Sequence, residues 1–212
     1  MKRESSLCFM KRFINKLVRL SSPASPPEVE RAEQIFYIDY LHEGMTVFDV
    51  GANIGELTLL FSRFVGAHGH VHSFEASHSV FKRLQTICEL SGRKNIILNH
   101  KALANKEGHV RLYIYDREHS GWNTLAQRPL HNYGIDVDPV GVEKVKATTV
   151  DRYCEKNGIS QIDLLKLDVE GAEYQVLLGA RSMLERKRIQ CCVFEFGQTT
   201  FDMGNDPGDI EE

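Results

Sequence analysis

The chain has 212 residues, enough for one domain with a sizeable core, and its 42% hydrophobic and 26% charged residues exclude a chain that is disordered throughout. A net charge of −3 gives no general attraction to nucleic acid, so we expect no nucleic-acid partner. The five cysteines are scattered and form no Cys-x-x-Cys pair. This pattern favours reduced, mostly buried thiols in a cytoplasmic protein over a disulfide framework or a zinc site.

The first predicted element is a basic amphipathic segment over residues 1–20, where six Lys or Arg residues accompany a single Glu. The pattern suits a solvated helix, which we favour, or weak contact with an anionic membrane surface. No apolar stretch here is long enough to span a bilayer. A Ser/Pro-rich linker ends this segment at residue 27. One domain is expected over 28–212, beginning with a helix over 28–42.

The most informative stretch is Val-Phe-Asp-Val-Gly-Ala-Asn-Ile-Gly at residues 47–55. Its apolar residues around Asp49 predict a strand covered on both faces. Gly51 and Gly55 predict a turn whose backbone a ligand can approach closely. A helix over 54–65 would point its free N–H groups into the same turn. Such a corner is typical of a nucleotide-like site, although an ordinary strand-turn-helix corner has the same pattern.

A second acid, Glu75, narrows the ligand class. It ends a predicted strand over 71–75 and follows Gly55 by twenty residues, close to the spacing of the ribose-binding acid in dinucleotide folds. The turn, however, lacks the Gly-x-Gly-x-x-Gly pattern that admits a pyrophosphate. This favours S-adenosylmethionine, which has a ribose and no phosphate, over the nicotinamide cofactor of an oxidoreductase. Asp49 would then help to hold the ammonium group of the ligand or to order nearby loops.

The middle of the chain alternates helices and strands. We expect a helix capped by Ser77 or Ser79 that runs to about residue 90, followed by strands over 95–99 and 110–115. A loop over 116–141 then leads to an edge strand over 144–150. A short helix follows, which Asp151 caps and Asn157-Gly158 ends. This alternation predicts an α/β fold with a doubly wound, mostly parallel sheet and helices on both faces. Ligands of such sheets bind beyond the carboxyl ends of the strands.

The long loop supplies candidate contacts for a small-molecule substrate, namely His119, Trp122 and Asn123. Loops of this length often carry function. Trp122 is the only tryptophan of the chain, and it could stack on a sugar face or equally fill a core position.

The second informative segment is Asp-Leu-Leu-Lys-Leu-Asp-Val-Glu-Gly-Ala-Glu at residues 163–173. A central parallel strand is usually almost entirely apolar. Here Lys166, Asp168 and Glu170 alternate with apolar residues, and burying such charges is costly unless they are paired or functional. The carboxylates also come at the end of the strand where the crevice is expected. We favour a functional cluster over a purely structural Lys–Asp pair followed by a glutamate at a helix start.

These segments together resemble the FkbM-type methyltransferase family. The resemblance lies in FDVGANIGELTLLFS (48–62), VHSFEA (71–76), KALANKEGHVRLYIY (101–115) and DLLKLDVEGAEYQVLLGA (163–180), and it covers most of residues 45–196. One departure is the Phe-Glu-Ala after the second strand, where the family more often has Phe-Glu-Pro. The resemblance implies the class I, Rossmann-like fold and S-adenosylmethionine-dependent methyl transfer, mostly to hydroxyl oxygens of sugars, lipids or polyketides.

The resemblance also implies site residues. The implied cofactor contacts are Asp49, Gly51, Asn53, Gly55 and Glu75, with Ala102 or Leu103 near the adenine. For the chemistry we expect Asp168 or Glu170 to act as the base or to position the acceptor, with Lys166 tuning that cluster and Glu173 as a weaker candidate. Paired carboxylates could instead hold a divalent ion, but no third ligand has diagnostic spacing, so we predict no metal site.

The end of the chain raises an alternative. Only sixteen residues follow Phe196, and they are rich in Gly and Asp, so the C-terminal antiparallel hairpin that closes class I methyltransferase sheets is expected to be missing. An unpaired apolar edge strand would favour a homodimer. The domain would then be C-terminally shortened, and the alternative function is a non-catalytic or impaired cofactor-binding fragment.

Overall fold

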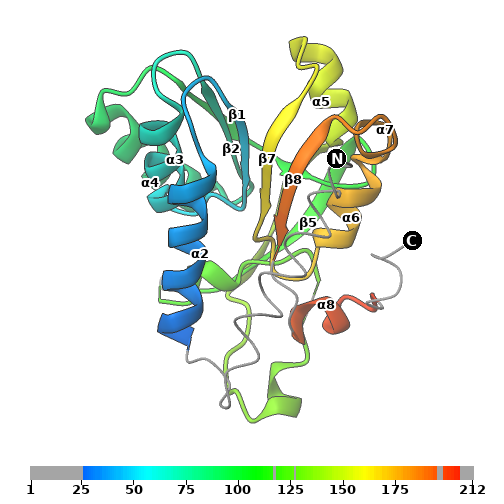
Figure 1. Cartoon of the computed structure of the whole chain (residues 1–212). Coiled ribbons are helices and arrows are strands. Elements are labelled where there is room, and N and C mark those ends of the chain that lie inside the picture. The colour runs from blue at the N-terminus through cyan, green and yellow to red at the C-terminus, as the bar shows by residue number, and fades with distance from the viewer. Residues whose placement is uncertain (1–25, 117, 127, 195–197, 206–212) are drawn as a thin grey trace, which may run out of the picture.

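The computed structural model describes residues 26–116, 118–126, 128–194 and 198–205 (Figure 1). The basic segment over residues 1–20 and Cys8 lie outside the described residues. The N-terminal helix α2 spans Pro26–Tyr40 and so begins two residues before the predicted domain start. Proline is tolerated there because the first turn of a helix has no acceptor for its N–H groups.

The larger sheet has five parallel strands in the order β3-β2-β1-β7-β8, as predicted for a doubly wound fold. These strands are β1 (Thr46–Val50), β2 (His70–Glu75), β3 (Ile96–His100), β7 (Ile162–Leu167) and β8 (Ile189–Phe194). The order reverses between β1 and β7, because the chain first winds outward to β3 and then returns to the other side of β1. Ligands of open α/β sheets bind at this kind of switch point.

Helices cover both faces of this sheet, and each face has its own core (Figure 1). One face carries α2, α3 (Glu56–Val65) and α4 (His78–Ser91), and the other carries α5 (Val150–Asn157), α6 (Glu173–Leu178) and α7 (Arg181–Glu185). Tyr37 and Phe61 are fully buried on the first side, and Phe48 and Leu165 on the second. The central strands are therefore covered on both faces, as the sequence predicts for the strand around Asp49.

A second, three-stranded sheet was not predicted. It contains β4 (Ala102–Leu103), β6 (Gly141–Thr148) and β5 (Gly108–Ile114) in that order, so the strand expected at an edge is the central one. β5 and β6 pair antiparallel, because the connection between them lacks the α-helical crossover that parallel neighbours need. The long loop between them contains two short 3-10 helices, η1 (Ser120–Trp122) and η2 (Leu130–Tyr133).

The predicted helix caps are partly wrong. Ser77 occupies the N-cap position of α4, but its side chain makes no capping hydrogen bond. Helix α5 is capped by Thr149, whose side chain accepts from the N–H of Arg152, and it ends at Gly158 as predicted. Asp151 lies two residues after this N-cap and does not cap its own helix. Its two carboxylate oxygens instead accept from the N–H groups of Ser182 and Met183, at the start of α7.

The C-terminal part adds a short helix, α8 (Gln198–Asp202), after β8. In the described part of the chain, β8 is an edge strand, and no strand pairs with its outer side. The four cysteines within the described ranges are free and buried, as predicted. Among the described residues, no helix has the length and apolar character needed to cross a membrane.

Candidate active site

The glycine turn after β1 has the conformation that its sequence predicts. Gly51, Asn53 and Gly55 all have positive φ angles, of 79°, 49° and 93°, which glycine adopts without strain and asparagine tolerates. Gly51 is also required for space, because a Cβ there would lie 1.8 Å from the carbonyl oxygen of Asp168. Any side chain at Gly51 would push β1 and β7 apart at their carboxyl ends. Gly55 marks the start of α3 and packs against Leu84.

Glu75 ends β2 beside this turn. Its two carboxylate oxygens accept hydrogen bonds from the backbone N–H groups of Asn53 (3.0 Å) and Ser77 (2.8 Å). The glycine turn is therefore attached to the second strand through the acid that the sequence predicts as the ribose ligand. Burial raises the pKa of Glu75 to about 7, although the backbone hydrogen bonds partly oppose this shift.

Asp49 lies behind the turn and is fully buried. One of its oxygens accepts from the hydroxyl of Thr58 in α3 at 2.6 Å, and the other lies 3.9 Å from the ammonium of Lys166. The second contact follows from the register, because Asp49 and Lys166 are directly paired residues of neighbouring strands. Burial raises the pKa of Asp49, while Lys166 and Thr58 oppose the rise. Asp49 thus holds α3 and Lys166 in place from beneath the site.

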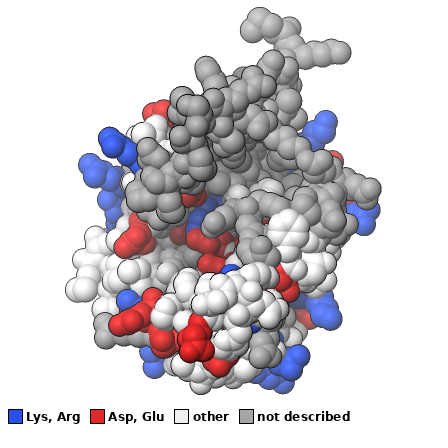
Figure 2. Space-filling model, turned by 90° about the horizontal axis from the view of Figure 1, so that it is seen from below, with Lys and Arg blue, Asp and Glu red and all other residues white. Residues whose placement is uncertain are grey.

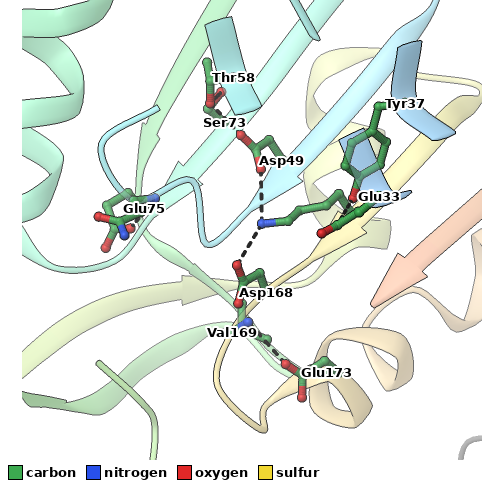
Figure 3. Close-up of polar contacts among 11 residues, drawn as sticks. Glu33, Tyr37, Asp49, Thr58, Ser73, Glu75, Asp168, Val169 and Glu173 are labelled. Atoms are coloured by element: carbon green, nitrogen blue, oxygen red, sulfur yellow. Dashed lines mark hydrogen bonds and ion pairs between the residues drawn. The ribbon is translucent and has the colours of Figure 1, made fainter. Parts of the chain in front are cut away.

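Lys166 connects Asp49 with Asp168, two acids that face each other from neighbouring strand ends (Figure 3). Its ammonium donates to Asp168 at 3.0 Å and is almost completely buried. Burial alone would lower the pKa of Lys166, but the two acids outweigh it and raise the pKa, so the ammonium stays charged. Asp168 keeps 47% of its side-chain surface exposed. It is therefore an oriented and accessible carboxylate.

The acidic turn, residues 168–173 after β7, differs from the predicted strand. β7 ends at Leu167, and Glu170 has a φ of 52°, so its side chain does not continue the alternation of the strand. Glu173 is almost completely buried, and one of its oxygens accepts from the N–H groups of Val169 (3.2 Å) and Gly171 (3.3 Å). Glu173 therefore shapes the turn from inside the protein instead of facing a ligand.

The acidic turn is also held from outside, by residues that the sequence did not indicate. Arg128 in the long loop lies 3.5 Å from the carboxylate of Glu170 and 3.2 Å from that of Asp202 in α8. Thr124 donates to the carbonyl of Glu170 at 2.7 Å, and Asn205 donates to the carbonyl of Gly171 at 3.0 Å. Segments before and after β7 in the sequence thus meet at this turn.

One pocket of about 330 Å³ opens at the carboxyl ends of β1, β2 and β7. It brings together nine of the predicted site residues: Gly51, Asn53, Glu75, Ala102, Leu103, Trp122, Asn123, Asp168 and Glu170. Asp49, Gly55, Lys166 and His119 do not line it. Figure 2 shows acidic side chains grouped near the middle of the face below the strand ends, with Lys and Arg mainly around its outline.

Several residues of the pocket wall are not among those that the sequence predicts. Ala76, Leu112 and Leu125 add apolar surface beside Ala102, and Lys101 is the one cationic residue among those that line the pocket within the described chain. Leu112 and Leu125 come from the second sheet and its loop, so no local pattern indicated them. Among all residues that the structure describes, no group of three or more His, Cys, Asp or Glu residues is arranged to hold a metal ion.

Comparison with known proteins gives three kinds of match. The family described as "Methyltransferase FkbM domain" matches residues 49–212. A curated relative, Methyltransferase 1 of Beauveria bassiana (strain ARSEF 2860), is 25% identical over 177 residues, which cover 75% of this chain and 70% of the relative. Among solved structures, methyltransferase FkbM from Methylobacillus flagellatus KT has a TM-score of 0.46 at 15% identity and covers 74% of this chain.

The match covers 39% of the M. flagellatus chain, so the present chain spans about two fifths of that solved protein. Aeropyrum pernix fibrillarin, solved with bound S-adenosyl-L-methionine, has a TM-score of 0.38 at 16% identity over 67% of this chain and 42% of that one. The family match includes both informative motifs, the glycine turn and the acidic turn. The chain therefore belongs to the FkbM methyltransferase domain family.

Proposed function

We propose that this chain transfers a methyl group from S-adenosylmethionine to a hydroxyl oxygen of a small molecule. The observation that carries the proposal is the convergence of the glycine turn, Glu75 and Asp168 on one pocket at the switch point of the sheet. The other support is the membership of the chain in a methyltransferase family.

The residues present fit this cofactor. Asn53 lines the pocket, and its side-chain oxygen is buried without a hydrogen-bond partner in the described chain, so a ligand donor would satisfy it. Glu75 would hold the ribose hydroxyls, and Ala76, Ala102 and Leu103 supply an apolar wall for the adenine. The pocket wall also carries three carboxylates, those of Glu75, Asp168 and Glu170, against the single cation of Lys101, which suits a cationic ligand.

When bound, S-adenosylmethionine supplies an electrophilic methyl group on a positively charged sulfur. Asp168 would accept the proton of the acceptor hydroxyl, which becomes more acidic as its oxygen forms the new bond to carbon. Lys166 would orient Asp168 through their 3.0 Å hydrogen bond. A positioned base typically contributes about 10²–10⁴-fold to the rate. Glu170, held by Arg128, would bind another hydroxyl of the acceptor.

Two observations favour oxygen over amino nitrogen as the acceptor atom. The candidate base is the carboxylate of Asp168, which Lys166 holds in place, and a hydroxyl acceptor must give up its proton to such a base. The chain also has no Asp/Asn-Pro-Pro-aromatic signature, because none of its six prolines stands in that setting. The signature is the usual arrangement for methylation of amino groups.

The test combines binding with transfer. Calorimetric titration should show uptake of S-adenosylmethionine and of its demethylated product, and radiolabelled donor should then label members of a panel of hydroxylated small molecules. Asp168→Asn should reduce turnover by about 10²–10⁴-fold while cofactor affinity stays within about threefold. Asp136→Asn, in an exposed loop position, is the matched control and should change neither.

No binding heat from the folded protein would remove the proposal altogether. Binding without transfer, equal in the wild type and Asp168→Asn, would instead indicate the non-catalytic cofactor-binding function.

A further inference from the structure

Trp122 shares the pocket with the residues that fit the cofactor. The pocket of about 330 Å³ is near the lower end of the size range for a site that holds one small ligand or cofactor. A ligand that contacts Gly51, Asn53 and Glu75 would share this space with the Trp122 side chain, which lines the same pocket. A large side chain that lines the same space is then expected to contact that ligand, so an acceptor must enter past it.

The polypeptide around Trp122 approaches the glycine turn at one end and is hydrogen-bonded to the acidic turn at the other. At one end, Gly121 lies over the glycine turn, because a Cβ on Gly121 would be 3.8 Å from the side-chain amide of Asn53. At the other end, Thr124 donates to the carbonyl of Glu170 at 2.7 Å in the acidic turn. Between them, the side-chain oxygen of Asn123 accepts from the N–H of Tyr115 at 2.9 Å. Trp122 therefore spans the gap between the two turns.

The indole ring of Trp122 is supported on its outer side. It packs edge-on against Tyr115, with ring centroids 6.3 Å apart, and its centroid lies 4.6 Å from that of the tilted His119 ring. Tyr115 and His119 do not line the pocket, whereas Trp122 does and is half-buried. The ring is thus held by two neighbours outside the pocket and has surface facing into it. Little conformational freedom would be lost if a ligand packed against that surface.

From this arrangement we propose that Trp122 is a cofactor-contacting residue whose indole covers the nucleoside of the bound methyl donor. This assigns Trp122 to the donor side instead of the acceptor side, and it rests on the proposed function. The aromatic face gives stacking or cation–π attraction to a ligand that combines a purine with a cationic sulfur. Truncation of an aromatic residue that stacks on a base commonly costs about tenfold in affinity.

The single tryptophan makes a direct test possible. Intrinsic tryptophan fluorescence of the wild-type protein reports on Trp122 alone, so titration with S-adenosylhomocysteine should change its intensity or emission maximum in a saturable way. In calorimetry, Trp122→Ala should weaken the binding of S-adenosylhomocysteine by about tenfold. Trp122→Phe should recover most of that loss. His131→Ala removes an exposed ring from the same loop outside the pocket and should leave affinity unchanged.

The outcomes separate this inference from the proposed function. If wild-type protein shows calorimetric binding but its emission does not change at saturation, Trp122 does not contact the ligand. Wild-type affinity in Trp122→Ala overturns the inference in the same way. A wild-type protein that binds no S-adenosylhomocysteine overturns the proposed function as well. Because the emission titration uses unmodified protein, it decides the matter even if Trp122→Ala fails to fold, which thermal unfolding would reveal.

Discussion

Glu75, which we propose as the ribose ligand, lowers the stability of the ligand-free protein near neutral pH. Its carboxylate is buried, so the charged form is disfavoured and the pKa rises to about 7 from an ordinary 4.5. Because the folded-state pKa is the higher one, the ligand-free protein loses stability as pH rises between about 4.5 and 7. The backbone N–H groups of Asn53 and Ser77 keep the carboxylate in place. A ligand that donates hydroxyl groups to the charged form would offset part of this cost.

The affinity for S-adenosylhomocysteine should therefore rise with pH near neutrality. Only the ionised Glu75 carboxylate is a strong acceptor for two ribose hydroxyls, and its ionised fraction grows about tenfold between pH 6 and pH 8 for a pKa of about 7. Calorimetry across this range should show a several-fold gain in affinity. Glu75→Gln should bind more weakly and with a flat pH profile. A flat profile in the wild type would show that Glu75 is already ionised at pH 6 or does not contact the ligand.

At the scale of elements, the caps of neighbouring helices connect parts of the chain that are far apart in sequence. Thr149 caps its own helix, α5, whereas Asp151 in the same helix satisfies two free N–H groups at the start of α7. The sequence marks Asp151 as a cap because aspartate is common at that position. Which helix it caps depends on the packing of α7 against α5, and local sequence does not encode that packing.

Asp151→Ala should lower the free energy of unfolding by about 1–2 kcal/mol, because two N–H groups of α7 lose their acceptor. Thr149→Ala should cost about 1 kcal/mol through its single capping bond. Urea unfolding measures both. Glu155→Ala, at an exposed position of α5, is the control and should stay within about 0.5 kcal/mol of the wild type. An Asp151→Ala protein as stable as that control would refute the cap across the two helices.

At the scale of the whole molecule, the two cores on either side of the sheet protect the thiols. Cys154 and Cys192 lie in the core beside α5, and Cys191 lies in the core beside α2. Burial raises the pKa of Cys154 to about 12 and that of Cys191 to about 11. Thiols react as thiolates, so both burial and the raised pKa suppress their reactivity.

In a Cys8→Ser background, the thiol reagent DTNB should react very slowly with the native protein and should titrate four thiols in denaturant. Their reaction rate should follow the unfolding equilibrium as urea is added, because the thiols become accessible only on opening. Rapid reaction of one or more thiols in the native protein would show that the packing around the sheet is looser than described. Cys88, on the buried side of α4, is the first residue to examine in that case.

Much of the site could be predicted because its parts carry local signals. Gly51 and Gly55 mark a turn that other residues would strain, and Glu75 ends a strand twenty residues after Gly55. Lys166 and Asp168 are conspicuous as charges in a strand that is otherwise buried. Predictions were less accurate where a residue's role depends on a distant partner, as for Glu173, which the structure places inside the acidic turn, and for Asp151.

By itself, the sequence determined the parallel sheet, the order of its main elements and the two motifs that meet in the site, because hydrophobic periodicity, glycine conformation and buried charge act over a few residues. The tertiary structure alone decided the second sheet, the pairing of Asp49 with Lys166 and the support of Glu170 by Arg128 and α8. These depend on strand register and on contacts between segments far apart in the chain. Such contacts form only when the whole domain packs, so local patterns do not show them.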